Sequence, residues 1–171
     1  MRHAPILNSG TAVERAQVRL HWPNEGACEA FAAMLASKAA LATACIELQG
    51  DLGTGKTTLV RHLLRALGVT GRIKSPTYAL VEQYGVQTAL HGGFDAWHFD
   101  FYRLQDASEF DSGGFRDLFA SPGLKLVEWP ERVAGAAPQA DLRIALQAVP
   151  GFEARRSVQC TAFTAVGQAL L

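Results

Sequence analysis

The first half of the chain shows a strand pattern followed by a helix pattern, twice over. Residues 17–22 alternate apolar and polar side chains, which predicts a strand. Asn24 is a candidate N-cap for a helix that we expect to run to about residue 40, with a buried face made of Ala27, Phe31, Met34 and Leu35. The apolar run 42–48 predicts a buried strand. Apolar residues at helical spacing predict a helix over residues 56–67, which Gly68 ends.

The second half of the chain predicts mostly short strands. In chain order we expect a strand at 79–84, a hairpin loop or insertion at 85–95, a strand at 97–101, short helical pieces within 105–121, a strand at 124–127, two late strands at 141–149 and 156–160, and a closing helix at 163–171. Alternating strands and helices predict an α/β fold.

The junction between the second strand and its helix carries the chemistry. Residues 50–57, GDLGTGKT, followed by Thr58, match the P-loop pattern G-x-x-x-x-G-K-[ST] at every fixed position. Its glycines allow the backbone to approach an anion closely, and the N–H groups at the helix start favour a phosphate. Lys56 can reach the β and γ phosphates, and the Thr57 hydroxyl can bind Mg²⁺. An ordinary glycine-rich turn at a helix start is the alternative.

Composition narrows the class of protein. The chain has 171 residues, 49% of them apolar and 19% charged, and Lys+Arg equals Asp+Glu at 16 each. These values predict a globular protein, and the neutral net charge argues against one that grips nucleic acid by a broad basic face. Cys28, Cys45 and Cys160 have neither metal-binding nor disulfide spacing, which favours core positions in a reducing compartment.

The ends and linkers of the chain predict one domain in the cytoplasm. We expect residues 1–14 to form a loose N-terminal leader without the pattern of a signal peptide. Residues 15–171 contain no internal repeat or linker and are expected to form a single domain. Glu29 and Lys38 interrupt the alanine-rich stretch 27–46, so we expect no membrane span there.

Three polar side chains after the P-loop helix are candidates for the functional site, because they lie in a loop or at the end of a predicted strand. Thr77, after Ser75-Pro76, is placed as a switch threonine would be, although a turn hydroxyl is an equal alternative. Asp100 lies near the end of its strand, where a Walker-B-type acid is expected. Glu128 could bind Mg²⁺ directly or through water, orient the attacking water, or simply cap the turn that follows. His98 has no second candidate ligand nearby and is expected to pack or hydrogen-bond.

Together, three stretches resemble the bacterial TsaE (YjeE) family. They are residues 50–57, residues 75–84 (SPTYALVEQY), and HFDFYRL at 98–104 ahead of LVEWPE at 126–131. The resemblance spans roughly residues 16–170. It implies a P-loop NTPase-like three-layer sandwich with a mostly parallel central sheet. It also implies an ATPase subunit of tRNA threonylcarbamoyladenosine modification, slow alone and stimulated by a TsaD–TsaB-type complex, which would be the route of contact with tRNA. Neither DNA nor a membrane is an expected partner.

The same resemblance implies roles for individual residues. Lys56, Asp100 and Glu128 would be catalytic, and Mg²⁺ would be held among Thr57, Asp100 and Glu128. ATP would be bound by Cys28, Asp51, Leu52, Gly53, Thr54, Gly55, Lys56, Thr57, Thr58, Thr77, Trp129 and Arg155. Cys28 falls where family members often carry a threonine near the adenine, and Arg155 falls where the late strand approaches the nucleotide.

Two other functions remain open at this point. A small-molecule kinase shares the P-loop and this chain length, but it commonly needs an arginine-rich lid, and no such stretch is evident. A binding module that holds ATP without turning it over is the other alternative. A GTPase is disfavoured, because the sequence contains no N-K-x-D or T-K-x-D motif.

Overall fold

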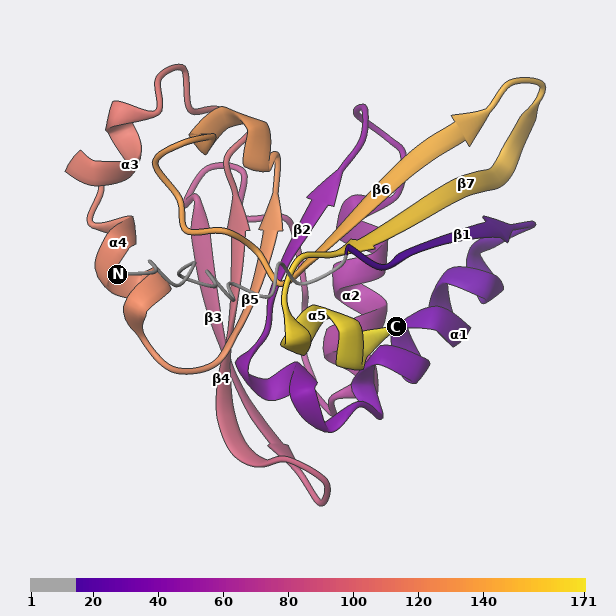
Figure 1. The fold of residues 1–171 in the computed structure, drawn as a ribbon, viewed down its shortest axis with the longest axis horizontal. Helices are drawn as coiled ribbons and strands as arrows, with labels where there is room; N and C mark the ends of the chain where they lie inside the picture. The colour runs from indigo at the N-terminus through magenta and orange to yellow at the C-terminus, as the bar shows by residue number, and fades with distance from the viewer. Residues whose placement is uncertain (1–14) are drawn as a thin grey trace, which may run out of the picture.

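The computed structural model describes residues 15–171, so the expected leader at 1–14 lies outside the described residues. Within them, one sheet has seven strands in the order β1-β7-β6-β2-β5-β4-β3 (Figure 1). Their bounds are β1 (Gln17–Trp22), β2 (Cys45–Gln49), β3 (Val81–Thr88), β4 (Gly92–Asp100), β5 (Leu124–Glu128), β6 (Leu142–Val149) and β7 (Phe152–Ala162).

The sheet is parallel in its centre and antiparallel at both edges. Strands β6, β2, β5 and β4 run parallel to their neighbours. Strand β3 pairs antiparallel with β4 at one edge, and β7 and β1 add antiparallel strands at the other. The predicted α/β fold is confirmed, with the parallel character confined to the four central strands. Their carboxyl ends share one edge of the sheet, which is where ligands bind in such folds.

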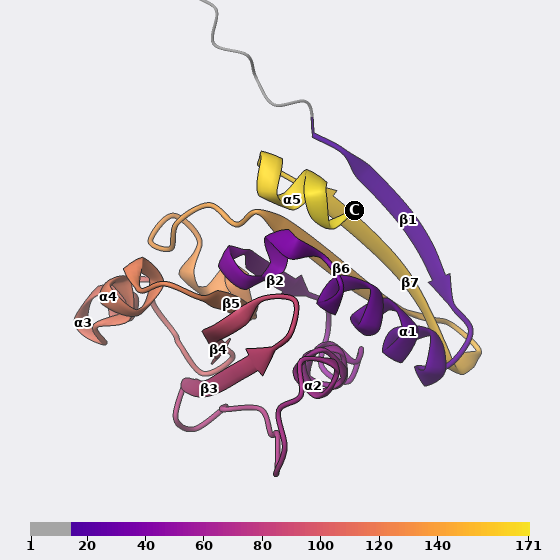
Figure 2. The ribbon, with the colours of Figure 1, turned by 90° about the horizontal axis from the view of Figure 1, so that it is seen from below.

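Helices cover both faces of the sheet. Their bounds are α1 (Glu25–Ala36), α2 (Lys56–Ala66), α3 (Ser108–Ser112), α4 (Phe115–Ala120) and α5 (Ala165–Leu170), with short 3₁₀ helices η1 (Ala39–Thr43) and η2 (Pro130–Val133). Figure 2 shows α1 and α2 on one side of the sheet and α3 and α4 on the other. Across residues 15–171, no helix combines the length and apolar character needed to cross a bilayer.

Strand β5 contributes to two hydrophobic clusters, because both of its faces are buried. Leu126 joins the larger cluster, to which α1 and α2 contribute residues such as Leu35 and Leu63. Val127, on the opposite face, joins a smaller aromatic cluster with Phe99 of β4 and Phe110 of α3. The period of two along β5 therefore connects the two helical layers through the sheet.

The predicted helix over 24–40 and the strand over 42–48 have different limits in the structure. The Asn24 side chain accepts from the Ala27 N–H at 3.2 Å, which confirms it as the N-cap, but α1 ends at Ala36. Residues 39–43 form η1, and β2 begins only at Cys45, where pairing with β5 starts. The apolar run alone could not show this limit, because a short apolar segment suits a buried helical turn as well as a strand.

The expected loop or insertion at 85–95 is largely regular strand, and that part of the prediction is wrong. Strand β3 continues to Thr88 and β4 begins at Gly92, so the loop is confined to residues 89–91. The paired ends of β3 and β4 form a ribbon at the bottom of Figure 1. Continuous cross-strand hydrogen bonding overrides the low strand preference of its glycines. Similarly, β7 begins at Phe152 and not at residue 156, so the gap between the two late strands is confined to residues 150–151.

Candidate functional site

The P-loop (residues 50–57) joins β2 to α2 in a conformation that needs glycine. Gly50, Gly53 and Gly55 have φ values of 142°, 79° and 104°. A Cβ on Gly50 would lie 2.3 Å from the Leu146 carbonyl oxygen, so only glycine lets the loop start against β6. In contrast, a Cβ on Gly53 or Gly55 would have nothing within 4 Å, which leaves open space above the loop.

That open space lies at the N-terminus of α2, where Gly55 is the N-cap. The first N–H groups of a helix have no partner within it, and the helix dipole places partial positive charge there. An open concavity with glycine backbone and a helix N-terminus fits the phosphates of a nucleotide. The geometry of the P-loop therefore suits a polyphosphate chain.

Lys56 is 4% exposed and bonds to the P-loop itself. Its Nζ donates to the carbonyl oxygens of Gly50 at 2.6 Å and Asp51 at 2.9 Å, and lies 4.1 Å from the centre of the Trp129 ring. Burial lowers the pKa of Lys56, and the nearby carboxylate of Glu128 acts in the opposite direction. Lys56 is thus a buried cation at the P-loop, close to where phosphates would lie.

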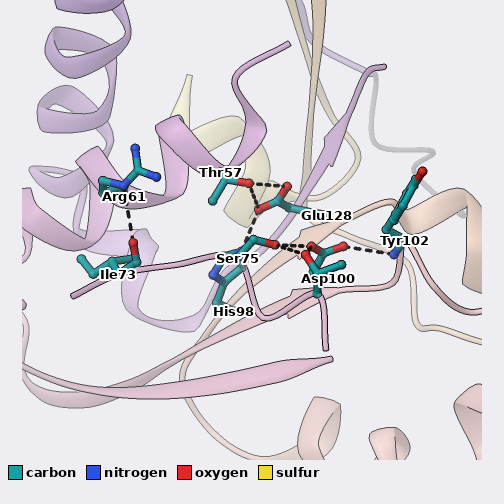
Figure 3. A network of polar contacts seen from close by, with 9 residues as sticks. Thr57, Arg61, Ile73, Ser75, His98, Asp100, Tyr102 and Glu128 are labelled. Carbon is teal, nitrogen blue, oxygen red and sulfur yellow. Dashed lines mark hydrogen bonds and ion pairs between the residues drawn. The ribbon is translucent and has the colours of Figure 1, made fainter. Parts of the chain in front are cut away.

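Thr57 and Glu128 meet across the site, from the start of α2 and the end of β5 (Figure 3). The Thr57 hydroxyl lies 2.9 Å from Oε1 and 3.0 Å from Oε2 of Glu128. The His98 Nε2 lies 2.8 Å from Glu128 Oε1. A hydroxyl and a carboxylate are the hard oxygen ligands that Mg²⁺ takes beside substrate phosphates, so these two residues fit a magnesium ion. In residues 15–171, no three His, Cys, Asp or Glu side chains form a metal-binding group.

Asp100 holds the loop between α2 and β3. Its Oδ2 accepts hydrogen bonds from the hydroxyls of Ser75 and Thr77, the latter at 2.7 Å, and its Oδ1 accepts from the Tyr102 N–H at 3.0 Å. The backbone adds a further contact, because the Asp100 N–H donates to the Leu80 carbonyl at 3.0 Å. Leu80 has a φ of 65°, which is uncommon for a residue with a side chain. Residues 75–80 are therefore tied to the end of β4.

Two neighbouring pockets flank the P-loop. One, of about 320 Å³, lies over Lys56 and Thr57 and reaches Asp100 and Glu128. The other, of about 370 Å³, lies between the P-loop and Cys28 of α1 and is also lined by β6 and β7. Both pockets are lined by Gly55 and Thr58, so they meet at the start of α2. The first suits phosphates and a metal, and the second suits the remainder of a nucleotide.

The predicted site residues divide between these pockets. The first pocket is lined by ten of them, namely Leu52, Gly53, Gly55, Lys56, Thr57, Thr58, Thr77, Asp100, Glu128 and Trp129. The second is lined by Cys28, Thr54, Gly55 and Thr58. Asp51 and Arg155 line neither pocket. Burial raises the pKa of the Cys28 thiol to about 12, which keeps this wall of the second pocket uncharged.

Arg156, rather than Arg155, faces the P-loop. Arg155 is exposed, with its guanidinium carbon 3.9 Å from the centre of the Phe152 ring. The Arg156 guanidinium donates to the carbonyl oxygens of Thr54 at 2.8 Å and Gly53 at 3.4 Å, and it lines the second pocket. The period of two along β7 explains the difference. The same alternation, read from the sequence, could have shown that Arg156 points inward, because Arg156 shares its face of the strand with the apolar residues Val158 and Cys160.

The structure adds other residues that the sequence did not single out as part of the site. Ser75 and Tyr102 line the first pocket beside Asp100, and Trp22 lines the second beside Cys28. Ser75 and Tyr102 lie within two residues of Thr77 and Asp100, so proximity in sequence was an available signal. Trp22 was visible only as the last residue of a strand. The sequence predicts that His98 packs or forms a hydrogen bond, and the structure identifies Glu128 as its hydrogen-bond partner.

Comparisons with known proteins give a consistent result. A family model described as "Threonylcarbamoyl adenosine biosynthesis protein TsaE" matches residues 22–157. The tRNA threonylcarbamoyladenosine biosynthesis protein TsaE of Haemophilus influenzae is 39% identical over 126 residues, which cover 74% of this chain and 75% of that protein. Its namesake from Bacillus subtilis is 34% identical, over 71% of this chain and 70% of that protein. The crystal structure of Bacillus subtilis YdiB matches with a TM-score of 0.70 at 25% identity, over 91% of this chain and 92% of that one.

Proposed function

The chain belongs to the TsaE family of threonylcarbamoyl adenosine biosynthesis proteins, and from that premise we propose that it is the subunit that binds and hydrolyses ATP in this pathway. In this proposal hydrolysis depends on Mg²⁺ and acts as a switch on a TsaD–TsaB-type complex. The observation that carries it is the convergence of Lys56, Thr57 and Glu128 in one pocket over the P-loop. A strand end, a helix start and a buried lysine meet there, as nucleotide hydrolysis requires.

The P-loop would bind the phosphates through its backbone N–H groups and Lys56. In the structure Lys56 donates to two carbonyl oxygens of the loop. A bound phosphate would take the place of these carbonyl oxygens as the acceptor, and its negative charge would make the hydrogen bond stronger. The second pocket, beside Cys28 and Arg156, would take the base and ribose. Arg156, and not Arg155 as first expected, would then contact the nucleotide from the late strand. Its guanidinium also donates to a P-loop carbonyl.

Thr57 and Glu128 would hold the Mg²⁺, which when bound would neutralise negative charge on the phosphates. Of the two acids, Glu128 is the better candidate for a direct ligand, because its carboxylate is in contact with the Thr57 hydroxyl, the other proposed ligand. Asp100 is already bonded to Ser75 and Thr77. We therefore propose that Asp100 places these hydroxyls beside the γ phosphate, where they sense whether it is present.

Hydrolysis would act on a partner through residues 75–80. This segment is anchored to Asp100 through two hydroxyls and the Leu80 carbonyl, and Tyr78 within it is 85% exposed. Loss of the γ phosphate would change the environment of Ser75 and Thr77, and the exposed segment would pass that change on. The neutral net charge fits a subunit that meets tRNA through its partner complex. The spacing of the three cysteines, which favours a reducing compartment, fits a place in the cytoplasm.

The test is phosphate release from ATP with Mg²⁺, by the protein alone and with a TsaD–TsaB-type complex added. We expect slow release alone and clear stimulation by the partners. Lys56→Ala and Glu128→Gln should each lower the stimulated rate by about 100-fold or more, since both remove charge from the γ-phosphate end of the pocket. Lys38→Ala and Glu29→Gln are matched controls that remove the same charges outside both pockets.

Two results would contradict the proposal. One is a stimulated rate in Lys56→Ala equal to that of the unaltered protein. The other is tight ATP binding without phosphate release even when the partners are present, which would favour a binding module. Transfer of the phosphate to a metabolite in place of water would instead identify a kinase.

A further inference from the structure

His98 of β4 is buried without being fully hydrogen-bonded. The residue is 0% exposed, and its Nε2 lies 2.8 Å from Glu128 Oε1. Its Nδ1 is buried and has no hydrogen-bond partner among the described residues 15–171. All of the ring's hydrogen bonding is therefore directed at one atom of the carboxylate that faces Thr57.

Packing alone does not explain this side chain. A buried ring nitrogen without a partner destabilises the folded state, and an apolar side chain of similar size would avoid that cost. Apolar residues Ala96 and Leu126 fill the same face of the sheet around His98. A buried polar group with an unpaired atom calls for a reason other than stability. The contact with Glu128 supplies one.

The sheet sets the geometry of this contact. Asp100 and Glu128 are paired in register on the parallel strands β4 and β5, and His98 is paired with Leu126. His98 and Glu128 are therefore diagonal neighbours on one face of the sheet. Thr57 contacts the same carboxylate from α2, so Glu128 is held from two elements at once (Figure 3).

We propose that His98 is a positioning residue, which holds the Glu128 carboxylate in the orientation that lets it share Mg²⁺ with Thr57. A carboxylate that binds a metal ion accepts hydrogen bonds, so in this proposal the ring donates through Nε2. Carboxylates that bind metals are commonly oriented in this way by a second layer of residues. The inference rests on the proposed function, because it requires a metal-dependent nucleotide site at Glu128.

Four variants separate positioning from packing. His98→Leu keeps the bulk and removes the donor. His98→Gln keeps a donor at about the reach of Nε2, whereas the shorter His98→Asn carries its donor too far from Glu128. His91→Leu is the matched control, because His91 also bonds through Nε2, at 2.9 Å to the Ala36 carbonyl, and lines neither P-loop pocket.

The measurement is Mn²⁺ affinity, followed by electron paramagnetic resonance, for the full chain loaded with a non-hydrolysable ATP analogue. Affinity for the analogue alone is measured in EDTA, and folding is followed by circular dichroism. For His98→Leu we expect Mn²⁺ affinity to fall about tenfold or more, with metal-free nucleotide affinity changed less than about twofold. His98→Gln and His91→Leu should bind Mn²⁺ like the unaltered protein, and His98→Asn should resemble His98→Leu.

Each outcome decides the question. If the unaltered protein shows no metal-dependent nucleotide binding, the proposed function itself fails. If it does, and His98→Leu binds Mn²⁺ equally well, only the inference about His98 is overturned. If His98→Leu does not fold, the comparison of His98→Gln with His98→Asn replaces it, and equal Mn²⁺ affinity in those two variants overturns the inference.

Discussion

At the scale of single residues, Glu128 and Asp100 have different partners although they are neighbours in register. Glu128 faces Thr57 at the start of α2, whereas Asp100 bonds to Ser75 and Thr77 in the following loop. The two carboxylates are therefore suited to different tasks, one toward a metal and one toward the loop. This difference comes from what each side chain meets and not from the strand position, which the two acids share.

Substitution of Arg155 and Arg156 tests which of these two neighbouring side chains contributes to ATP binding. Arg156→Ala removes hydrogen bonds to two P-loop carbonyls, and one wall of the second pocket with them. We expect ATP affinity to fall by about 10-fold, which corresponds to about 1.4 kcal/mol, because the P-loop loses two contacts that hold it and the second pocket loses one wall. Arg155→Ala, the matched control, should leave affinity unchanged. Isothermal titration calorimetry with both variants measures this, and equal affinities would contradict the assignment of Arg156 to the site.

At the scale of elements, caps and pairing partners decide where helices and strands end. Helix α1 begins at a side-chain cap on Asn24 and ends at Ala36, with the Ser37 N–H donating to the Ala33 and Met34 carbonyls. Strand β2 begins at Cys45, whose N–H donates to Asp141 Oδ2 at 2.8 Å. A cap can be recognised locally, but a start fixed by a residue 96 positions away cannot.

The N-cap of α1 yields a stability prediction at the element scale. Asn24→Ala leaves the Ala27 N–H without its side-chain acceptor, and the free energy of unfolding should fall by about 1 kcal/mol. Asn24→Asp replaces the amide oxygen with a carboxylate oxygen that can accept the same hydrogen bond, and its free energy of unfolding should lie within about 0.5 kcal/mol of the original. Urea denaturation followed by circular dichroism gives both values. A loss of the same size in both variants would show that the cap hydrogen bond is not its source.

At the scale of the whole molecule, the P-loop is supported from both sides of the sheet's centre. Strand β6 lies against Gly50, Arg156 of β7 holds the carbonyls of residues 53 and 54, and Glu128 of β5 meets Thr57. The antiparallel edge formed by β7 and β1 therefore does more than complete the core. It supplies one wall of the second pocket, through Trp22 and Arg156.

Buried thiols predict how the stability of the whole molecule depends on pH. Burial raises the pKa of Cys160 to about 12, and burial raises that of Cys28 to about 12 as well. Thiols of the unfolded chain ionise with a pKa of about 8.5, so above that pH the folded state retains protons that the unfolded state has lost. This stabilisation is complete below that pH and is lost as the pH rises toward the folded-state value.

We therefore expect the free energy of unfolding to fall between about pH 9 and 11, by up to about 1.4 kcal/mol per pH unit for each thiol. Guanidinium denaturation at several pH values measures the slope. Cys160→Ala removes one of these groups, which is 0% exposed, and should give a shallower fall whatever its stability at neutral pH. Parallel slopes in the two proteins would contradict the contribution of this thiol.

Much of the site followed from local patterns. The P-loop and its helix were set by fixed spacing and helical periodicity, and Asp100 and Glu128 by the apolar runs before them. The strand limits at 85–95 were predicted wrongly, because glycines indicate a loop locally while pairing between β3 and β4 forms a ribbon. Local preference is weaker than a continuous ladder of hydrogen bonds.

Local sequence patterns are enough to predict the α/β class, the P-loop, its helix and the strands that end in acids, because each depends on residues close together in the chain. The folded chain was needed to show that Thr57 contacts Glu128, that His98 contacts the same carboxylate, and that Arg156 donates to the P-loop carbonyls. Those contacts join elements 30 to 102 residues apart. They depend on strand order and register, which arise from packing of the whole chain. The alternation along β7 indicates which face Arg156 occupies, but it does not indicate what lies opposite that face.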